Sequence, residues 1–201
     1  MDFILKSISY VFHPLIMPLL GVIFYFHKTP RFIPEPIQQA KIFSISLLTI
    51  VLPLLVYYLL KTIKKVDSIY LKTTQERKLP LLINAIIISL VISRVFPYDE
   101  IIELYFFFIG VLCSTLLCLI LAMGKIKASI HMMAASGFFM FVVCLGYHFK
   151  INVNGTIALL IVLLGAIGTS RLHLKAHTFL ELFIGLTIGA APQLLLLMID
   201  S

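Results

Sequence analysis

Long apolar stretches separated by short polar connections constrain this chain more than any other feature of its sequence. Seven of them can be traced, over residues of about 8–27, 42–60, 79–96, 101–123, 129–148, 155–169 and 179–199. A spanning helix needs about 20 mostly apolar residues, and the sixth stretch reaches that length only if its flanking residues lie near the membrane surface. No stretch alternates like a strand, and open sheet edges are not tolerated in lipid. The pattern predicts an all-α, polytopic transmembrane bundle of six to seven spanning helices, with residues 1–201 as one domain.

The composition agrees with a membrane location and limits the classes of partner. The chain is 61% hydrophobic and 12% charged, against roughly 45–50% and about 25% in soluble domains. A net charge of +7 is compatible with nucleic-acid binding, but there is no soluble basic face and no basic run studded with aromatic residues. We therefore expect no nucleic acid as partner. The cations are expected beside anionic lipid headgroups, in a phosphate-binding pocket, or both.

The predicted helices place three connections on the same face as the N-terminus: residues 61–78, 124–128 and 169–177. Most of the 16 Lys and Arg residues fall on this face, which the positive-inside rule assigns to the cytoplasm. Several of these cations are also candidates for chemistry. Without them the two faces are equally basic, so the sidedness of the chain stays open, as does its oligomeric state.

The densest group of polar and ionisable residues lies at the entry to the last apolar stretch. It consists of Ser170, Arg171, His173, Lys175, His177 and Glu181. If residues 173–181 form a helix, His173, His177 and Glu181 share one face at a spacing of four. A hydrogen bond from His177 to Glu181 would then leave the other ring nitrogen as a lone-pair nucleophile.

A second group, Lys127, Ser129 and His131, is predicted on the same face. Cations and a hydroxyl stabilise oxyanions, and His131 could protonate a leaving group. Arg77 could add a third contribution just before Pro80, which is expected near the start of a helix, where proline is tolerated.

Other conspicuous residues are interpreted as structural. The isolated histidines His13, His27 and His148 are expected at the surface or in interfaces. Gly185 and Gly189 form a GxxxG pattern, which indicates close packing of two helices.

Two of these segments carry a resemblance to a known family. The segment SRLHLKAHTFLE reads as SRxxxxxHxxxE and resembles the third signature of the type-2 phosphatidic acid phosphatase family, SRxxxxxHxxxD. ASIH at 128–131 resembles the second signature, PSGH, and two predicted spans separate the segments, as that fold requires. Lys72 and RKLP at 77–80 are only a loose counterpart of the first signature, KxxxxxxRP. The chain is also similar to short, divergent bacterial members with HPLIMP-like N-termini.

The resemblance implies a bacterial inner-membrane enzyme that hydrolyses a lipid phosphate or diphosphate without a metal or other cofactor. By position, His177 would be the nucleophile, Glu181 its orienting carboxylate and His131 the general acid. The phosphate would be held by Arg171, Ser129, Lys127, Arg77 and Ser170. Undecaprenyl diphosphate, phosphatidylglycerol phosphate, phosphatidic acid and a lipid A phosphate are all compatible substrates.

Two alternatives stand beside this one. In a metal-dependent membrane hydrolase, His173, His177 and Glu181 would bind zinc and activate water, although the nearby cations disfavour a bound cation. In a non-enzymatic relative, the protein would bind or transport lipid phosphates without cleaving them. Transport favours helices broken at mid-membrane, whereas the polar groups here flank helix ends.

Overall fold

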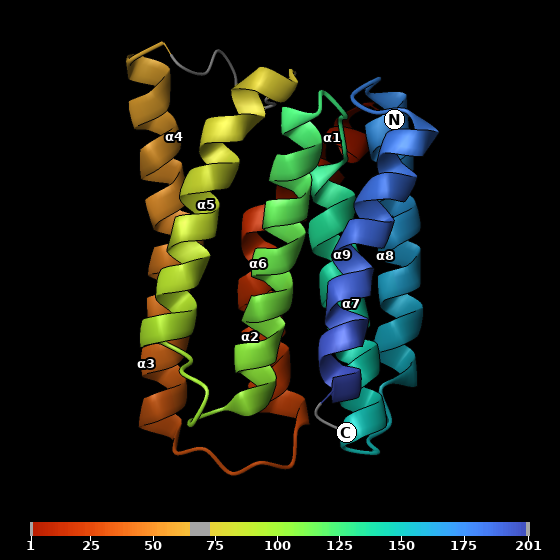
Figure 1. The fold of residues 1–201 in the computed structure, drawn as a ribbon. Helices are drawn as coiled ribbons and strands as arrows, with labels where there is room; N and C mark the ends of the chain where they lie inside the picture. Colours follow the sequence, from red (N-terminus) through yellow and green to blue (C-terminus); the bar gives the residue numbers. More distant parts are fainter. Residues whose placement is uncertain (1, 65–72, 200–201) are drawn as a thin grey trace.

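The computed structural model describes residues 2–64 and 73–199, and every regular element in these ranges is helical (Figure 1). The elements are α1 (Asp2–Val11), the 3-10 turn η1 (Pro14–Ile16), α2 (Met17–Lys28), α3 (Glu35–Ser46), the π-helical turn η2 (Leu47–Val51), α4 (Leu52–Thr62), α5 (Thr74–Arg94), α6 (Ile102–Met123), α7 (Ile130–His148), α8 (Asn154–His173) and α9 (Phe179–Ile199). The prediction of an all-α bundle is confirmed for the described part of the chain.

Among the described residues, five helical stretches are long and apolar enough to cross a membrane: Ser7–Lys28, Glu35–Thr62, Ile102–Met123, Ile130–His148 and Asn154–His173. A shorter apolar helix follows at Phe179–Leu194. Such helices are those of an integral membrane protein. The sixth predicted stretch is long enough because helix α8 continues through Ser170 to His173.

Helix α5 begins earlier than the sequence suggested. Thr73 caps this helix: the Glu76 backbone N–H donates to Thr73 Oγ1 at 3.3 Å, and the Thr73 hydroxyl donates to Glu76 Oε1 at 2.9 Å. The prediction that Pro80 lies near the helix start is therefore wrong, because it lies inside the helix. The earlier start places Arg77 in the second turn, buried against the bundle. Lys72 lies outside the described residues.

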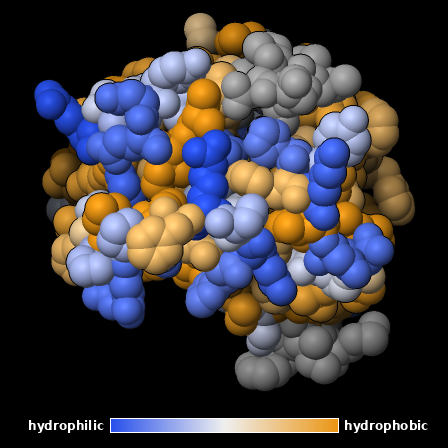
Figure 2. Space-filling view, turned by 90° about the horizontal axis from the view of Figure 1, so that it is seen from below, coloured by the Kyte–Doolittle hydropathy of each residue, from blue (hydrophilic) through white to orange (hydrophobic). Residues whose placement is uncertain are grey.

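The bundle has two distinct ends. Helices α5, α7 and α9 begin at the upper end in Figure 1, where α6 and α8 finish and the N-terminus lies. We call this the site end, because the candidate residues lie there. The opposite, far end carries the α2–α3, α5–α6 and α7–α8 connections, and Figure 2 shows hydrophilic side chains gathered there in patches between apolar ones.

Helices α7 and α9 approach each other closely through the GxxxG pattern. A methyl group on Gly185 would collide with the backbone of Ser129, and one on Gly189 would collide with the Met133 carbonyl. The Ser136 hydroxyl crosses the same interface and donates to the Leu186 carbonyl at 2.9 Å. The predicted close packing is confirmed, and it brings the beginnings of α7 and α9 side by side.

Candidate functional site

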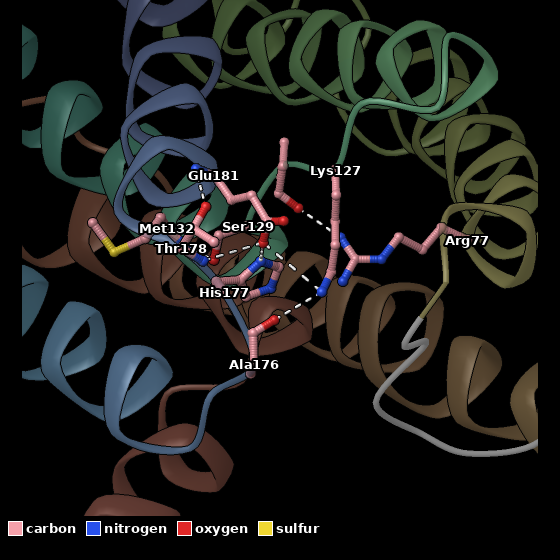
Figure 3. Close-up of polar contacts among 9 residues, drawn as sticks. Arg77, Lys127, Ser129, Met132, Ala176, His177, Thr178 and Glu181 are labelled. Carbon is pink, nitrogen blue, oxygen red and sulfur yellow. Dashed lines mark hydrogen bonds and ion pairs between the residues drawn. The ribbon is translucent and has the colours of Figure 1, made fainter.

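A capping box at the start of α9 fixes the carboxylate of Glu181. Its backbone N–H donates to Thr178 Oγ1 at 3.3 Å, and its Oε2 accepts the Thr178 backbone N–H at 3.4 Å. The same Oε2 lies 2.6 Å from Nδ1 of His177. The T-x-x-E sequence therefore holds the acid in the position that orients the histidine, as Figure 3 shows.

His177 is buried beside cations, and this environment keeps its imidazole neutral. Burial, followed by the positive charges of Arg77, Lys127 and Arg171, lowers the pKa of His177 to about 3. A neutral ring that donates through Nδ1 to Glu181 has its lone pair on Nε2. The pair thus has the tautomer that a nucleophilic histidine requires.

The α8–α9 connection turns His177 toward the bundle. Helix α8 ends in a Schellman motif, in which the Ala176 backbone N–H donates to the Arg171 carbonyl at 3.0 Å and Lys175 takes a left-handed φ of 50°. Residues 173–181 are therefore not one helix, and the expected single face of His173, His177 and Glu181 is wrong. His173 ends α8 with an exposed side chain, whereas His177 precedes α9 and is buried.

Three contacts join the α6–α7 connection to the α8–α9 connection and to the first turn of α9 (Figure 3). Lys127 Nζ donates to the Ala176 carbonyl at 2.8 Å and lies 3.8 Å from Glu181 Oε2. The Ser129 backbone N–H donates to the Glu181 carbonyl at 3.0 Å. Ser129 also caps α7, since its Oγ accepts the Met132 N–H at 3.4 Å. The two predicted clusters are thus brought together.

A cavity of about 240 Å³ lies directly beneath these connections. His177, His131, Arg77 and Arg171 all line it, so both predicted histidines and both predicted arginines face one space. The two arginines are held by Ala128 and Ser9: Arg77 Nη1 donates to the Ala128 carbonyl at 2.6 Å, and Arg171 Nη1 lies 3.4 Å from Ser9 Oγ. Three helices, α5, α7 and α9, point their positive N-terminal ends at this end of the bundle. This end of the cavity is suited to a phosphate-like anion.

The other predicted residues surround the cavity without lining it. Ser170 is fully buried and donates to the Leu5 carbonyl at 2.6 Å, with Ser9 Oγ 2.7 Å away. Ser129 is equally buried as the α7 cap. Lys127 and Glu181 contact the His177 site from outside the cavity: the charge of Lys127 lowers the pKa of His177, and Glu181 orients its ring. In this structure these four residues support the groups that face the cavity.

His13 belongs to the cavity, whereas the sequence predicted a position at the surface or in an interface. It lines the cavity, and its ring lies edge-on to that of His131 with centroids 5.5 Å apart. The Leu15 N–H approaches His13 Nδ1 at 3.4 Å, which caps η1. His131 in turn places Nε2 3.2 Å from the Ser9 carbonyl. The break in the first apolar stretch at His13–Pro14 was the signal for this residue.

The described residues contain no group of three or more His, Cys, Asp and Glu side chains arranged to hold a metal ion. Comparisons of the chain with family models, curated proteins and solved structures give no match.

Proposed function

We propose that this protein hydrolyses a phosphate or diphosphate ester of a membrane lipid through a phosphohistidine at His177, without a metal ion. One observation carries the proposal: a neutral His177, oriented by Glu181 at 2.6 Å, lines the same cavity as His131, Arg77 and Arg171. Nucleophile, second histidine and cations are the parts that phosphoryl transfer to an imidazole needs.

In the first step, Nε2 of His177 attacks the terminal phosphorus, and the bond from this phosphorus to the leaving oxygen breaks: the ester oxygen of a monophosphate or the bridging oxygen of a diphosphate. His131 takes the proton of the bound monoanionic phosphate group and gives it to that oxygen, so the lipid leaves as an alcohol or a monophosphate. In the second step, water attacks the phosphohistidine while His131 takes one proton back. Inorganic phosphate takes this proton as it leaves, so both histidines are restored to their neutral forms. Arg77 and Arg171 balance the negative charge on the phosphoryl oxygens throughout.

A lipid is favoured over a soluble ester because the cavity lies among long apolar helices and continues between them. The resemblance of the SRxxxxxHxxxE and ASIH segments to type-2 phosphatidic acid phosphatases supports the same chemistry and a bacterial inner-membrane location. A zinc site of His173, His177 and Glu181 is not favoured, since the exposed His173 ends a different helix from the one that carries Glu181.

The test is phosphate release by the purified protein from a panel of phosphorylated lipids, with and without a chelator. We expect release that the chelator does not reduce. His173→Ala serves as a matched control for His177→Ala and should retain most of the rate. Equal loss in both variants, or loss with the chelator, would favour the metal-dependent mechanism. Binding of the lipids without release would favour a non-hydrolytic binder or transporter.

A further inference from the structure

The cavity that begins at His177 continues far into the apolar part of the bundle. Along α7 its lining runs from Ile130 to Phe138, and along α5 from Arg77 to Ile88. At 1.5 Å per helical residue these spans correspond to about 12 Å and about 16 Å. The cavity is therefore much deeper than a phosphate group requires.

Beyond the His177 site the cavity is lined mostly by apolar side chains, and it reaches the surface of the bundle beside α1 and α4. Tyr10 on α1 and Leu54 on α4 both line it, with 54% and 36% of their surfaces exposed. Helix α4 follows the π-helical turn η2 and carries Pro53, which lacks the N–H of a regular helical turn. In a membrane this side opening faces lipid chains, because it lies within two of the long apolar stretches.

The deep end is polar. Gln193 on α9 is 1% exposed and lines the cavity, and its Nε2 donates to the Phe107 carbonyl at 3.0 Å. Its Oε1 is buried and has no hydrogen-bond partner among the described residues. Ser114 and Thr49, which donate to carbonyls of their own helices, line the same region. An alkyl chain that reached Gln193 would meet a buried amide whose Oε1 it cannot offer a hydrogen bond, which is less favourable than contact with apolar surface.

We propose that this cavity holds one hydrocarbon chain of the lipid whose phosphate lies at His177, and that Gln193 sets its maximum length. The inference rests on the proposed function, because the phosphate site fixes where the chain begins. Continuity with the His177 site and an opening toward lipid identify the occupant as a chain entering from the bilayer. The polar floor explains why its length is limited: a chain that stops above Gln193 fills only apolar surface.

Two substitutions should move the preferred chain length in opposite directions. Ala134 lines the cavity one turn below His131, so Ala134→Leu fills space that the chain would occupy. Gln193→Leu replaces the polar floor by an apolar group of similar size, which admits longer chains. Ala158 is exposed on the outer face of α8, so Ala158→Leu is the matched control.

The experiment uses a homologous series of monoalkyl phosphates. Binding is measured by competition with a fluorescent monoalkyl phosphate in the His177→Ala background, and phosphate release is measured with His177 present. Ala134→Leu should weaken binding of the longest chains bound by the parent protein about tenfold and favour shorter ones. Gln193→Leu should strengthen binding of still longer chains, and Ala158→Leu should leave the profile unchanged.

An unchanged length profile in both cavity variants, or the same shift in Ala158→Leu, would overturn this assignment. The outcome for hydrolysis is separate. If the binding profile shifts as expected but no alkyl phosphate is cleaved, the chain-binding cavity stands and the proposed hydrolysis falls.

Discussion

The two ends of the bundle each contain a His–Glu pair, and the surroundings of the pairs differ. At the site end, His177 and Glu181 meet at 2.6 Å and the histidine faces a cavity with two arginines. At the far end, Glu103 is fully buried near the start of α6 and lies 3.7 Å from His148 Nε2. Neither Glu103 nor His148 lines that cavity.

The partners of each carboxylate explain the difference. Glu103 accepts the Tyr25 hydroxyl at 2.9 Å and forms an ion pair with Arg31 at 2.7 Å, so its charge is balanced by residues that join α2, the α2–α3 connection and α6. Glu181 instead shares Lys127 with the Ala176 carbonyl. The comparison teaches that a His–Glu pair is a candidate for chemistry only where its histidine lines a cavity together with cations. At the far end the same residue types stabilise the packing of neighbouring helices.

The largest expected effect is the difference in phosphate release between the His177 and His148 variants. His177→Ala should lower phosphate release by about 10⁴-fold or more, because it removes the nucleophile. His148→Ala should leave the rate per folded protein nearly unchanged. The measurement is single-turnover phosphate release by both variants, and comparable losses would break the distinction between the two ends.

We expect kcat to depend on the negative charge at position 181 more than on the length of that side chain. In Glu181→Gln the amide no longer stabilises the N–H tautomer at Nδ1, so we expect a loss of about 10²–10⁴-fold in kcat. Glu181→Asp keeps the charge and the capping role and should retain a large share of the rate. Steady-state kinetics would show the orienting role to be wrong if both variants kept the parent rate.

Glu103 should affect stability and leave the chemistry intact. Glu103→Ala leaves the buried Tyr25 hydroxyl without its partner, which costs about 1–3 kcal/mol. We expect a lower melting temperature in detergent, followed by circular dichroism, together with an unchanged kcat in the folded protein. A selective loss of kcat at unchanged melting temperature would show that the far end takes part in the reaction.

The smallest expected effect is in the titration of His177. Its pKa of about 3 in the folded protein lies below the value near 6.5 of an unfolded chain. The unfolded state therefore binds more protons between these values, and this residue lowers stability as pH falls from about 6.5 toward 3. In ¹³C-histidine-labelled protein, the signal lost in His177→Gln should remain that of a neutral ring at about pH 5. An imidazolium signal at that pH would contradict the environment described for His177.

Much of the architecture could be predicted from sequence because apolar length and helix-breaking residues are local properties. The apolar stretches correspond to helices, and the Gly185–Gly189 pattern packs as expected because glycine spacing alone permits backbones to approach. The start of α5 was missed because the N-cap at Thr73 outweighed the preference of Pro80 for a helix beginning.

The site was only partly predictable. The segments around His131 and His177 were found because their ionisable residues stand out beside apolar stretches. The roles of Ser129 and Ser170 and the position of His13 depend on contacts across the bundle, such as the one between Ser170 and Ser9. Such contacts join residues far apart in the chain, so sequence spacing does not reveal them.

The central claim is a phosphoryl group on His177, and it can be measured directly. Protein quenched with denaturant at alkaline pH during turnover of a ³²P-labelled lipid phosphate should carry acid-labile label on the peptide that contains His177. Label on another residue, or steady turnover of the lipid with no labelled protein at any quench time, would contradict the account.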